Sequence, residues 1–449
     1  MFLAMETRES MMHVGGLLPF SPPPDGGRDV IRRMRDELRS NPVVQPPWNV
    51  KLRHPELLKS PLQAWVPDDR PDLQYHVRRS ALPSPGDERE LGTLVSRLHG
   101  QSLDFHRPPW EVHLIEGLEG GRLALYFKVH HALVDGYTGM RLLTHALSDD
   151  PEDTDTPLLF ARNPQPRPPH DHESPPPGLD TLLRAVRDQI QTQKDLGRAL
   201  LAIARSKRSS AASLVSPLQA PRSILNQKVT RARRFATQQY RLDRIKAVAR
   251  RHGCTINDAM LTLCAGALRR FLGEQGALPD EPLTAMVPVN IRPKDDPGGG
   301  NAVGALLASL ATDVADPIDR LHTIVASTTK AKAQLQGMSR NAILQYSALL
   351  MAPILLASVP GAAGRIRPAF NLVVSNVPGP DKPLYFRGWR LEAAYPLSIP
   401  FNGYALNITV ESYAGTLGVG FIGCREAIPH LQRLAVYTGE ALEELENAE

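Results

Sequence analysis

Two neighbouring segments in the first third of the chain constrain the fold more than any other feature of the sequence. Residues 110–116 and 122–130 both have the composition of β-strands, and the sequence GLEGG between them supplies turn glycines. In the second segment, apolar side chains recur at every other position from Leu123 to Val129, which is the period of a strand. The sequence therefore predicts a β-hairpin, because two such segments joined by a glycine turn pair antiparallel.

The second strand runs directly into a histidine pair and then into a helix. The sequence is KVHHALVDGYTGM, in which His130 and His131 precede Asp135 and Gly136. Asp135 is well placed to cap the helix, since its side chain can accept hydrogen bonds from free backbone N–H groups. The two rings of an extended pair point to opposite faces. We therefore expect only one of them to face a given cleft, and alternation places His131 in the same row as Val129.

A histidine at this strand–helix junction is suited to general-base catalysis. The reference pKa of imidazole, about 6.5, lets it take a proton from a hydroxyl group near neutral pH. The carboxylate of Asp135 would orient the ring or hold the loop through a salt bridge to an arginine. No serine elbow or reactive cysteine accompanies the pair, which favours direct attack by the acceptor over a covalent intermediate. We do not expect a metal site, because adjacent histidines diverge and no third ligand is evident.

The remainder of the chain indicates two αβ halves and a connector. The chain has 449 residues, which is long for a single core, and 42% of them are hydrophobic. Residues 151–178 are rich in proline and polar side chains, and a basic amphipathic helix is expected after them. We therefore divide the chain into an N-terminal domain at 1–150, a connector with its helix at 151–220, and a C-terminal domain at 221–449.

Apolar spacing predicts the main helices and strands outside the hairpin. Helices are expected at 255–273 and 428–446 and at 86–103, a strand ending in proline at 282–293, a strand that enters a tight turn at 370–380, and a second hairpin at 405–423. The formal net charge is only +5, and no basic cluster is interleaved with aromatic residues, so nucleic-acid binding is not expected. The longest apolar stretch, 346–364, contains two prolines, and we interpret it as buried or interfacial.

The motif HHxxxDG at a strand–helix junction resembles the CoA-dependent acyltransferase superfamily with the chloramphenicol-acetyltransferase-like fold. Within it, the chain is similar to the bacterial wax ester synthase/acyl-CoA:diacylglycerol acyltransferase family over almost its full length. The matching blocks are MHVGGLLPF, RPPWEVHLIEGLEGGRLALYFKVHHALVDG, INDAMLTLCAGALRRFL, PVNIRP with GNAVGALL, and NLVVSNVPGP. One departure is that the usual PLW is PPW here. The resemblance implies an α/β (α+β) fold of two similar domains with a channel between them.

The resemblance also implies roles for the histidine motif. His131 would be the general base that takes the proton from an alcohol, whose oxygen then attacks the thioester carbonyl of acyl-CoA and displaces CoA. His130 would support it, and Gly136 would permit a tight entry into the helix. Asp135 would be structural and paired with an arginine from the other half, for which Arg292 in PVNIRP is the candidate.

Further residues of the matching blocks are implied at the substrates. Asn257 would hold the oxyanion or the acceptor, and an N-cap role for the same residue stays open as the structural alternative. Asp258 would shape the helix start beside it. The turn that begins with Ser375 and Asn376 would line or brace the channel, with a purely structural turn as the alternative. Trp110 is the remaining candidate for substrate binding.

The implied reaction moves a long-chain acyl group from acyl-CoA to the hydroxyl of a diacylglycerol or fatty alcohol. No cofactor is expected, because acyl-CoA is a substrate. Three alternatives stay open: a small alcohol or amine acceptor, a carrier-protein thioester as donor, and a catalytically silent lipid-binding protein. We expect a cytoplasmic location and leave open peripheral contact with the inner membrane or lipid inclusions. The segments 179–210 and 349–363 are candidates for acyl-chain lining or membrane contact.

Overall fold

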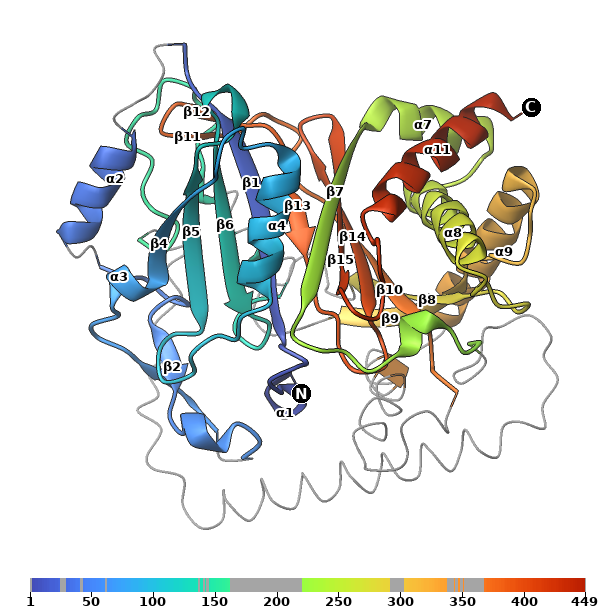
Figure 1. Cartoon of the computed structure of the whole chain (residues 1–449), viewed down its shortest axis with the longest axis horizontal. Coiled ribbons are helices and arrows are strands. Elements are labelled where there is room, and N and C mark those ends of the chain that lie inside the picture. Colours follow the sequence, from blue (N-terminus) through green and yellow to red (C-terminus); the bar gives the residue numbers. More distant parts are fainter. Residues whose placement is uncertain are drawn as a thin grey trace.

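The computed structural model describes two β-sheets that stand side by side, with helices packed against them (Figure 1). The residues that it describes are 2–24, 30–40, 43–60, 63–135, 138–139, 142, 145–161, 220–290, 303–336, 343, 346–347, 350 and 367–448. The expected helix at 179–210 and most of the apolar stretch 346–364 lie outside these residues.

The first sheet contains the predicted hairpin. Strands β5 (Trp110–Glu116) and β6 (Leu123–His130) pair antiparallel, and β6 also pairs with β1 (His13–Ser21). Strand β4 (Val77–Ala81) lies parallel to β5 at one edge. The helix expected at 86–103 is α4 (Glu88–His99), and its predicted apolar face is buried. The hairpin prediction is confirmed.

Three short strands from the second half of the chain complete the first sheet. They are β11 (Tyr385–Phe386), β12 (Trp389–Leu391) and β13 (Tyr395–Leu397). Strands β12 and β13 pair with β1 on the side that β6 leaves open. An uncovered β1 would present unpaired backbone groups, which sheets generally protect. The expected C-terminal domain was the continuous range 221–449. Residues 385–397 within that range, which contain β11, β12 and β13, belong instead to the first sheet.

The second sheet has six strands among the described residues, in the order β7, β15, β14, β10, β8 and β9. Their bounds are Arg233–Arg241, Thr416–Cys424, Leu406–Tyr413, Leu372–Val377, Thr284–Asn290 and Val303–Ser309. The predicted hairpin at 405–423 is β14 and β15. Its two turn residues, Ala414 and Gly415, both have positive φ values, 44° and 82°, as a tight two-residue hairpin turn requires.

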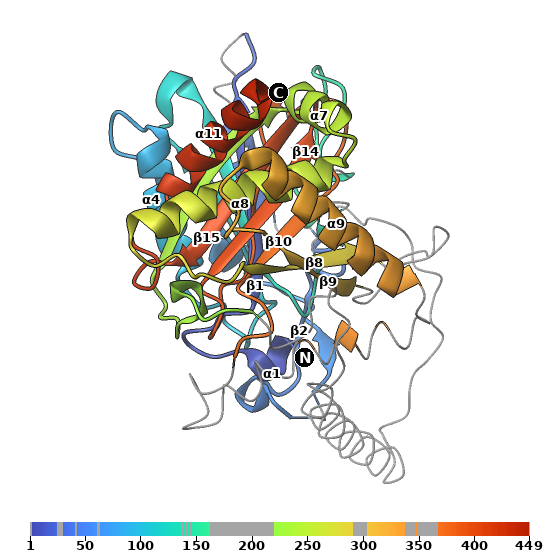
Figure 2. The same cartoon turned by 90° about the vertical axis from the view of Figure 1, so that its right-hand side faces the viewer.

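Four helices cover the face of the second sheet that is turned away from the first sheet (Figures 1 and 2). They are α7 (Leu242–Arg251), α8 (Ile256–Glu274), α9 (Pro317–Gln336) and α11 (Arg433–Asn447). The last helix begins at Arg433, five residues after the expected start. The shorter elements are α1 (Phe2–Met5), α2 (Val30–Arg39), α3 (Leu73–His76), β2 (Val50–Leu52), β3 (Trp65–Pro67) and the 3-10 turns Pro55–Leu57, Glu119–Gly121 and Ile224–Asn226.

Strand alternation gives the second sheet an apolar face and a mixed face. On β14, Leu406, Ile408 and Val410 belong to the core under the helices, so the side chains between them point toward the first half of the molecule. Apolar residues of both halves meet on that side. We call this group the interdomain cluster: Met12, Ala305, Leu307, Leu350, Ala369, Phe370, Val373, Ile399, Phe401 and Tyr404, with Phe2, Met5, Val14, Met286 and Tyr346 packed against it.

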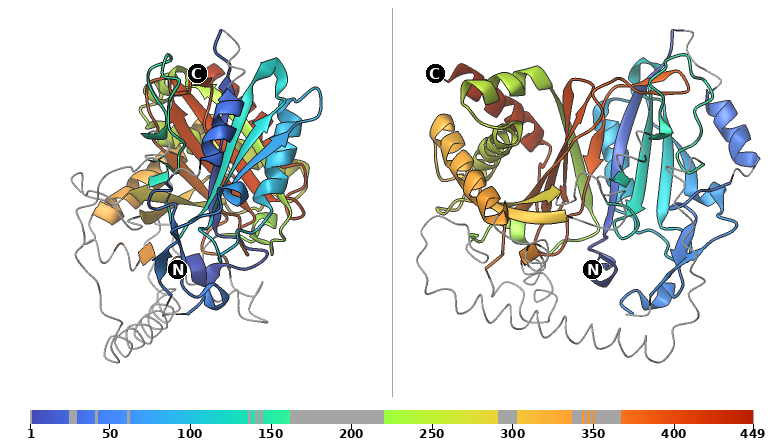
Figure 3. Two further views of the ribbon diagram at one scale, coloured as in Figure 1. Left: turned by 90° about the vertical axis from the view of Figure 1, so that its left-hand side faces the viewer. Right: turned by 180° about the vertical axis from the view of Figure 1, so that it is seen from behind.

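Helix α1 lies beside the start of β1, next to the second sheet (Figures 1 and 3). Phe2 and Met5 of α1 pack against the interdomain cluster. A four-residue helix is too short to be stable in isolation, so its conformation depends on these contacts. The N-terminal segment therefore belongs to the packing between the two sheets.

Candidate active site

The histidine pair lies where β6 ends, with backbone hydrogen bonds to both neighbouring segments. His130 is the last residue of β6 and is opposite His13 of β1, and its N–H donates to the carbonyl of Pro109 at 3.0 Å. His131 follows in a turn, and its N–H donates to the carbonyl of Met12 at 2.9 Å. These contacts fix the backbone of both histidines before any side-chain contact is considered.

The two rings have different environments. His130 is only 1% exposed, and its Nδ1 accepts a hydrogen bond from the N–H of Ala132 at 3.1 Å. Its Nε2 lies 3.4 Å from Oε2 of Glu6, and the edge of Phe105 packs against the ring at a centroid distance of 5.2 Å. The ring of His130 therefore has contacts on several sides and is part of the interior. Its supporting role in catalysis stays a prediction.

His131 is partly buried and stacks on the ring of Phe2. The two ring centroids are 4.1 Å apart and the planes differ by 12°. Burial lowers the pKa of His131 below its usual value, although the charge of Asp135 acts in the opposite direction. Its Nδ1 is buried and has no hydrogen-bond partner among the described residues. The imidazole is therefore neutral near pH 7, which is the form that can accept a proton.

Asp135 caps the helical turn after the pair, as predicted. Its Oδ1 accepts a hydrogen bond from the N–H of Thr138 at 2.7 Å, and its carbonyl accepts one from Gly139 at 2.8 Å. The side chain is 5% exposed, so its charge acts on the nearby His131 with little screening. Gly136 and Arg292 lie outside the described residues, and the ion pair between Asp135 and Arg292 stays a prediction.

The start of α8 corrects one expectation. Thr255 is the N-cap, and Asn257 lies in the first turn, so the N-cap alternative for Asn257 is wrong. Thr255 and Asp258 form a capping box, in which Oδ2 of Asp258 accepts from the N–H and the hydroxyl of Thr255 at 3.1 and 2.6 Å. The hydroxyl of Thr328 donates to the other carboxylate oxygen at 2.7 Å. Asp258 thus shapes the helix start as expected, and its contact with substrate stays a prediction.

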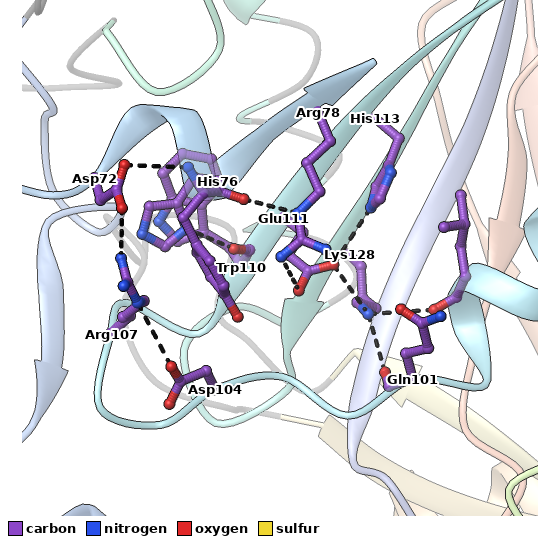
Figure 4. Close-up of polar contacts among 12 residues, drawn as sticks. Asp72, His76, Arg78, Gln101, Asp104, Arg107, Trp110, Glu111, His113 and Lys128 are labelled. Atoms are coloured by element: carbon purple, nitrogen blue, oxygen red, sulfur yellow. Dashed lines mark hydrogen bonds and ion pairs between the residues drawn. The ribbon is translucent and has the colours of Figure 1, made fainter. Parts of the chain in front are cut away.

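Trp110 lies in the interior of the first half of the molecule. It is 1% exposed, and its indole N–H donates to the carbonyl of Trp48 at 2.7 Å. Its ring stacks on His76 at a centroid distance of 4.3 Å and on Phe160 at 5.4 Å (Figure 4 shows Trp110 with His76). Packing accounts for these contacts, and the predicted role of Trp110 in substrate binding stays a prediction.

Ser375 and Asn376 lie on β10, where they are opposite Thr409 and Val410 of the parallel strand β14. Alternation places Ser375 on the same face as Val373 of the interdomain cluster, whereas Asn376 points the other way and is exposed. A hydrogen bond to β14 braces the following turn, because the N–H of Gly379 donates to the side-chain hydroxyl of Ser412 at 3.1 Å. The structural alternative for this turn therefore has direct support, and lining of the channel stays a prediction.

A buried polar network around Lys128 and Glu111 in the first sheet was not identified from the sequence (Figure 4). The amine of Lys128 is 3.3 Å from Oε2 of Glu111 and donates to the carbonyls of Leu98 and Gln101 at 3.2 and 2.9 Å. Burial acts to raise the pKa of Glu111, but the hydrogen bond with His113 and the charge of Lys128 outweigh it and lower the pKa to about 2. The register seen in the structure places Lys128 opposite Glu111, and the sequence prediction of the two strands did not include this register.

The second sheet contains a buried glutamate with the opposite behaviour. Glu411 of β14 is 3% exposed, and its Oε1 has no hydrogen-bond partner among the described residues. Burial without a partner raises its pKa to about 8, so this carboxyl is mostly protonated at pH 7. Glu411 is opposite Val377 of β10, on the face that looks toward the first half of the molecule.

No three histidine, cysteine, aspartate or glutamate side chains in the described part of the chain are arranged to hold a metal ion. No helix in the same part of the chain has the length and apolar character needed to cross a bilayer.

The sequence matches two family descriptions in succession. Residues 1–260 match the wax ester synthase/diacylglycerol acyltransferase catalytic domain, and residues 299–446 match the WS/DGAT C-terminal domain. A Mycobacterium tuberculosis protein named as a diacylglycerol O-acyltransferase is 51% identical over 481 residues, covering 100% of this chain and 96% of the relative. The O-acyltransferase WSD of Acinetobacter baylyi is 39% identical over 444 residues, covering 98% and 94%.

Solved structures agree with these sequence matches. A wax ester synthase/diacylglycerol acyltransferase from Marinobacter aquaeolei superposes with a TM-score of 0.77 at 38% identity, over 99% of this chain and 96% of that one. The first condensation domain of the calcium-dependent antibiotic synthetase superposes with a TM-score of 0.55 at 18% identity, over 98% and 91%. The second likeness concerns the fold alone, and it is consistent with the expected two-domain acyltransferase architecture.

Proposed function

The chain belongs to the wax ester synthase/diacylglycerol acyltransferase family, and from this premise we propose that it is an acyl-CoA-dependent O-acyltransferase. It moves a long-chain acyl group from acyl-CoA to the hydroxyl of a diacylglycerol or a fatty alcohol. The products are a triacylglycerol or a wax ester, and free CoA. The observation that carries the proposal is a neutral, partly buried histidine, His131, beside an apolar cluster between two sheets.

In this proposal His131 is the general base. Its unprotonated ring nitrogen takes the proton of the acceptor hydroxyl as the oxygen forms a bond to the thioester carbon. The carbon–sulfur bond then breaks, and the CoA thiolate takes the proton back from the imidazolium. The proton balance closes within one turnover, so no metal or cofactor is needed for this step. The lowered pKa of His131 supports the role, because it keeps the base form populated at neutral pH.

The interdomain cluster supports a long acyl chain over a short one. Its members come mainly from β9, from β10 and the residues before it, from the segment between β13 and β14, and from the segment that leads into β1. Phe2 joins this cluster to the imidazole, since its ring contacts both. Apolar side chains next to the base favour binding of an apolar chain, at roughly 0.8 kcal/mol for each methylene removed from water.

The remaining residues have proposed roles around the reacting carbonyl. Asn257 holds the oxyanion or the acceptor, which is compatible with its position in the first turn of α8, where the helix dipole favours negative charge. Asp135 holds the loop in place with Arg292. Ser375 faces the channel from β10 beside the interdomain cluster. For Asn376 and Trp110 the structure offers no contact that favours substrate over packing.

We also propose that the protein works in the cytoplasm and meets its substrates at the surface of a membrane or lipid inclusion. The reason is chemical, because a diacylglycerol or a long-chain alcohol partitions into lipid and not into water. Contact would be peripheral. Sedimentation with lipid vesicles that contain diacylglycerol, beside vesicles without it, measures this contact, and equal recovery in the supernatant would contradict it.

The reaction is tested by release of CoA thiol from palmitoyl-CoA with hexadecanol, with a diacylglycerol, with a short alcohol and with no acceptor. We expect release that depends on a long-chain acceptor, and the better acceptor then identifies the physiological class. Faster release with the short alcohol would overturn the choice of acceptor. If the protein is active only with an acyl group bound to a carrier protein, the donor is that carrier-protein thioester and not acyl-CoA. Lipid binding without thiol release from any donor would indicate a silent binding protein.

A further inference from the structure

The residue that covers the proposed base comes from the very beginning of the chain. Phe2 of α1 stacks on His131 with a centroid distance of 4.1 Å and an angle of 12° between the planes. This nearly parallel arrangement covers one face of the imidazole with an apolar surface. Water cannot reach that face while the stack is in place. The same phenyl ring packs against the interdomain cluster, where an acyl chain is proposed to lie.

Specific contacts with both halves of the molecule hold the segment behind Phe2. Glu6 is buried, its carboxylate accepts from the N–H of Met12, and it lies 3.4 Å from Nε2 of His130. On the other side, the guanidinium of Arg233 donates to the carbonyl of Glu9 at 2.7 Å. The segment from Phe2 to Met12 is thus fixed between the histidine pair and the second sheet. The stack on His131 is a consequence of this anchoring.

The chemistry of the proposed reaction explains why such a cover matters. A base that removes a proton from an alcohol can equally remove one from water. Water would then add to the thioester carbon, the carbon–sulfur bond would break, and a free fatty acid and CoA would be released. Enzymes that transfer groups suppress this reaction by excluding water from the reacting atoms. In this chain, Phe2 is the described side chain that stacks on the imidazole.

Resting on the proposed function, we infer that Phe2 is a positioning residue that holds the imidazole of His131 and excludes water from the ring face that it covers. By doing so it determines how the acyl group divides between the alcohol and water. The carboxylate of Glu6 sets the position of Phe2 indirectly, through its contacts with Met12 and His130. The acceptor reaches the free edge of the imidazole, and the phenyl ring remains stacked during transfer.

The charged and titratable groups that act on His131 are Asp135 and His130, and their effects on its pKa are opposite. Neither is altered by a substitution at Phe2. Burial is the largest cause of the lowered pKa, and the phenyl ring contributes to that burial. Removal of the ring should therefore move the pKa of His131 upward, toward its ordinary value. The acid limb of the pH–rate profile reports this change separately from any loss of protein stability.

The experiment compares Phe2→Ala, Phe2→Leu and a matched control, Leu3→Ala, in the full chain. Palmitoyl-CoA and hexadecanol are supplied, and both the ester and free palmitate are quantified. We expect Phe2→Ala to raise the ratio of palmitate to ester about tenfold, a difference of 1.4 kcal/mol between the two barriers. The acid limb of ester formation should shift to higher pH. Phe2→Leu should restore part of the ratio, and Leu3→Ala should behave as the unmodified protein.

An unchanged ratio and an unchanged acid limb in Phe2→Ala would overturn the inference. If Phe2→Ala does not fold, as judged by circular dichroism, an unchanged ratio in Phe2→Leu has the same meaning, because leucine cannot stack. The variant His131→Ala distinguishes a failure of the proposed function from a failure of the role of Phe2. Full ester formation by His131→Ala would overturn the proposed function, whereas its loss together with an unchanged ratio in both Phe2 variants would overturn only the role of Phe2.

Discussion

Two buried glutamates, one in each sheet, show how differently this fold treats an interior carboxyl group. Glu111 of β5 lies within reach of Lys128, Arg78 and His113, and these partners lower its pKa to about 2 despite burial. Glu411 of β14 has no such partner, and burial raises its pKa to about 8. The two side chains are equally exposed, at 3%. Even so, at pH 7 the carboxyl group of Glu111 is charged and that of Glu411 is mostly neutral.

The difference shows that partners, and not burial, decide the charge state of an interior carboxyl group. It also separates two uses of a polar interior. The charged network of Glu111 and Lys128 binds the backbone carbonyls of Leu98 and Gln101. Phe105, four residues after Gln101 in the sequence, packs against His130. Glu411 makes no comparable described contact, and at pH 7 it acts as a neutral polar group.

The largest expected effect comes from removing the cation of the first sheet. Lys128→Met should lower the free energy of unfolding by about 3–5 kcal/mol, because it leaves the carboxylate of Glu111 buried with fewer partners. Urea denaturation measures this change. The double variant Lys128→Met/Glu111→Gln is the control, and it should recover much of the loss. If the two single effects simply add in the double variant, the residues are not coupled and the comparison fails.

A smaller effect is expected at Glu411, and its sign depends on pH. Folded Glu411 keeps its proton up to about pH 8, whereas the unfolded state loses it near its ordinary pKa of 4.5. Stability should therefore fall as pH rises between these values, with a limiting slope of about 1.4 kcal/mol per pH unit. Glu411→Gln should remove this fall, with a relative gain of roughly 3 kcal/mol at pH 7. Parallel stability curves for the two proteins would contradict the raised pKa.

The smallest effect is expected at a third buried acid, Asp258, whose hydrogen-bond partners are mainly hydroxyl and N–H groups. Asp258→Ala should lower the free energy of unfolding by about 1–2 kcal/mol, the usual range for loss of a helix cap. The reason is that Thr255 and Thr328 lose a shared acceptor. Thr255→Ala is the matched control, since it removes the other half of the capping box. If Asp258→Ala lowers the free energy of unfolding as much as Lys128→Met does, then hydroxyl partners stabilise a buried carboxylate in this fold as strongly as a cation does.

Local features of the fold were readable from the sequence because they depend on near neighbours. The alternation from Leu123 to Val129 predicted β6, and Asp135 was recognised as a cap. The spacing Thr255-x-x-Asp258 is the signature of a capping box. The alternative role for Asn257 placed the N-cap two residues too late, because it did not use this spacing.

Long-range partners could not be read in the same way. Residues 385–397 have the short apolar pattern of strands, but nothing in that pattern indicates that they pair with β1. The stack of Phe2 on His131 joins positions 129 residues apart, and no periodicity connects them. The unpaired state of Glu411 likewise depends on what lies around it in three dimensions. Each of these requires the packed structure, because burial and contact are properties of the whole chain.

The central claim is that His131 is the general base, and its most direct test is the rate of ester formation by His131→Ala beside His130→Ala. Both variants are first shown to be folded by circular dichroism. We predict that His131→Ala loses activity by a factor of about 10²–10⁴, the usual contribution of a general base. His130→Ala should lose less, since its ring is held in the interior by Glu6 and Phe105. A folded His131→Ala protein that forms ester at the unmodified rate would contradict the account.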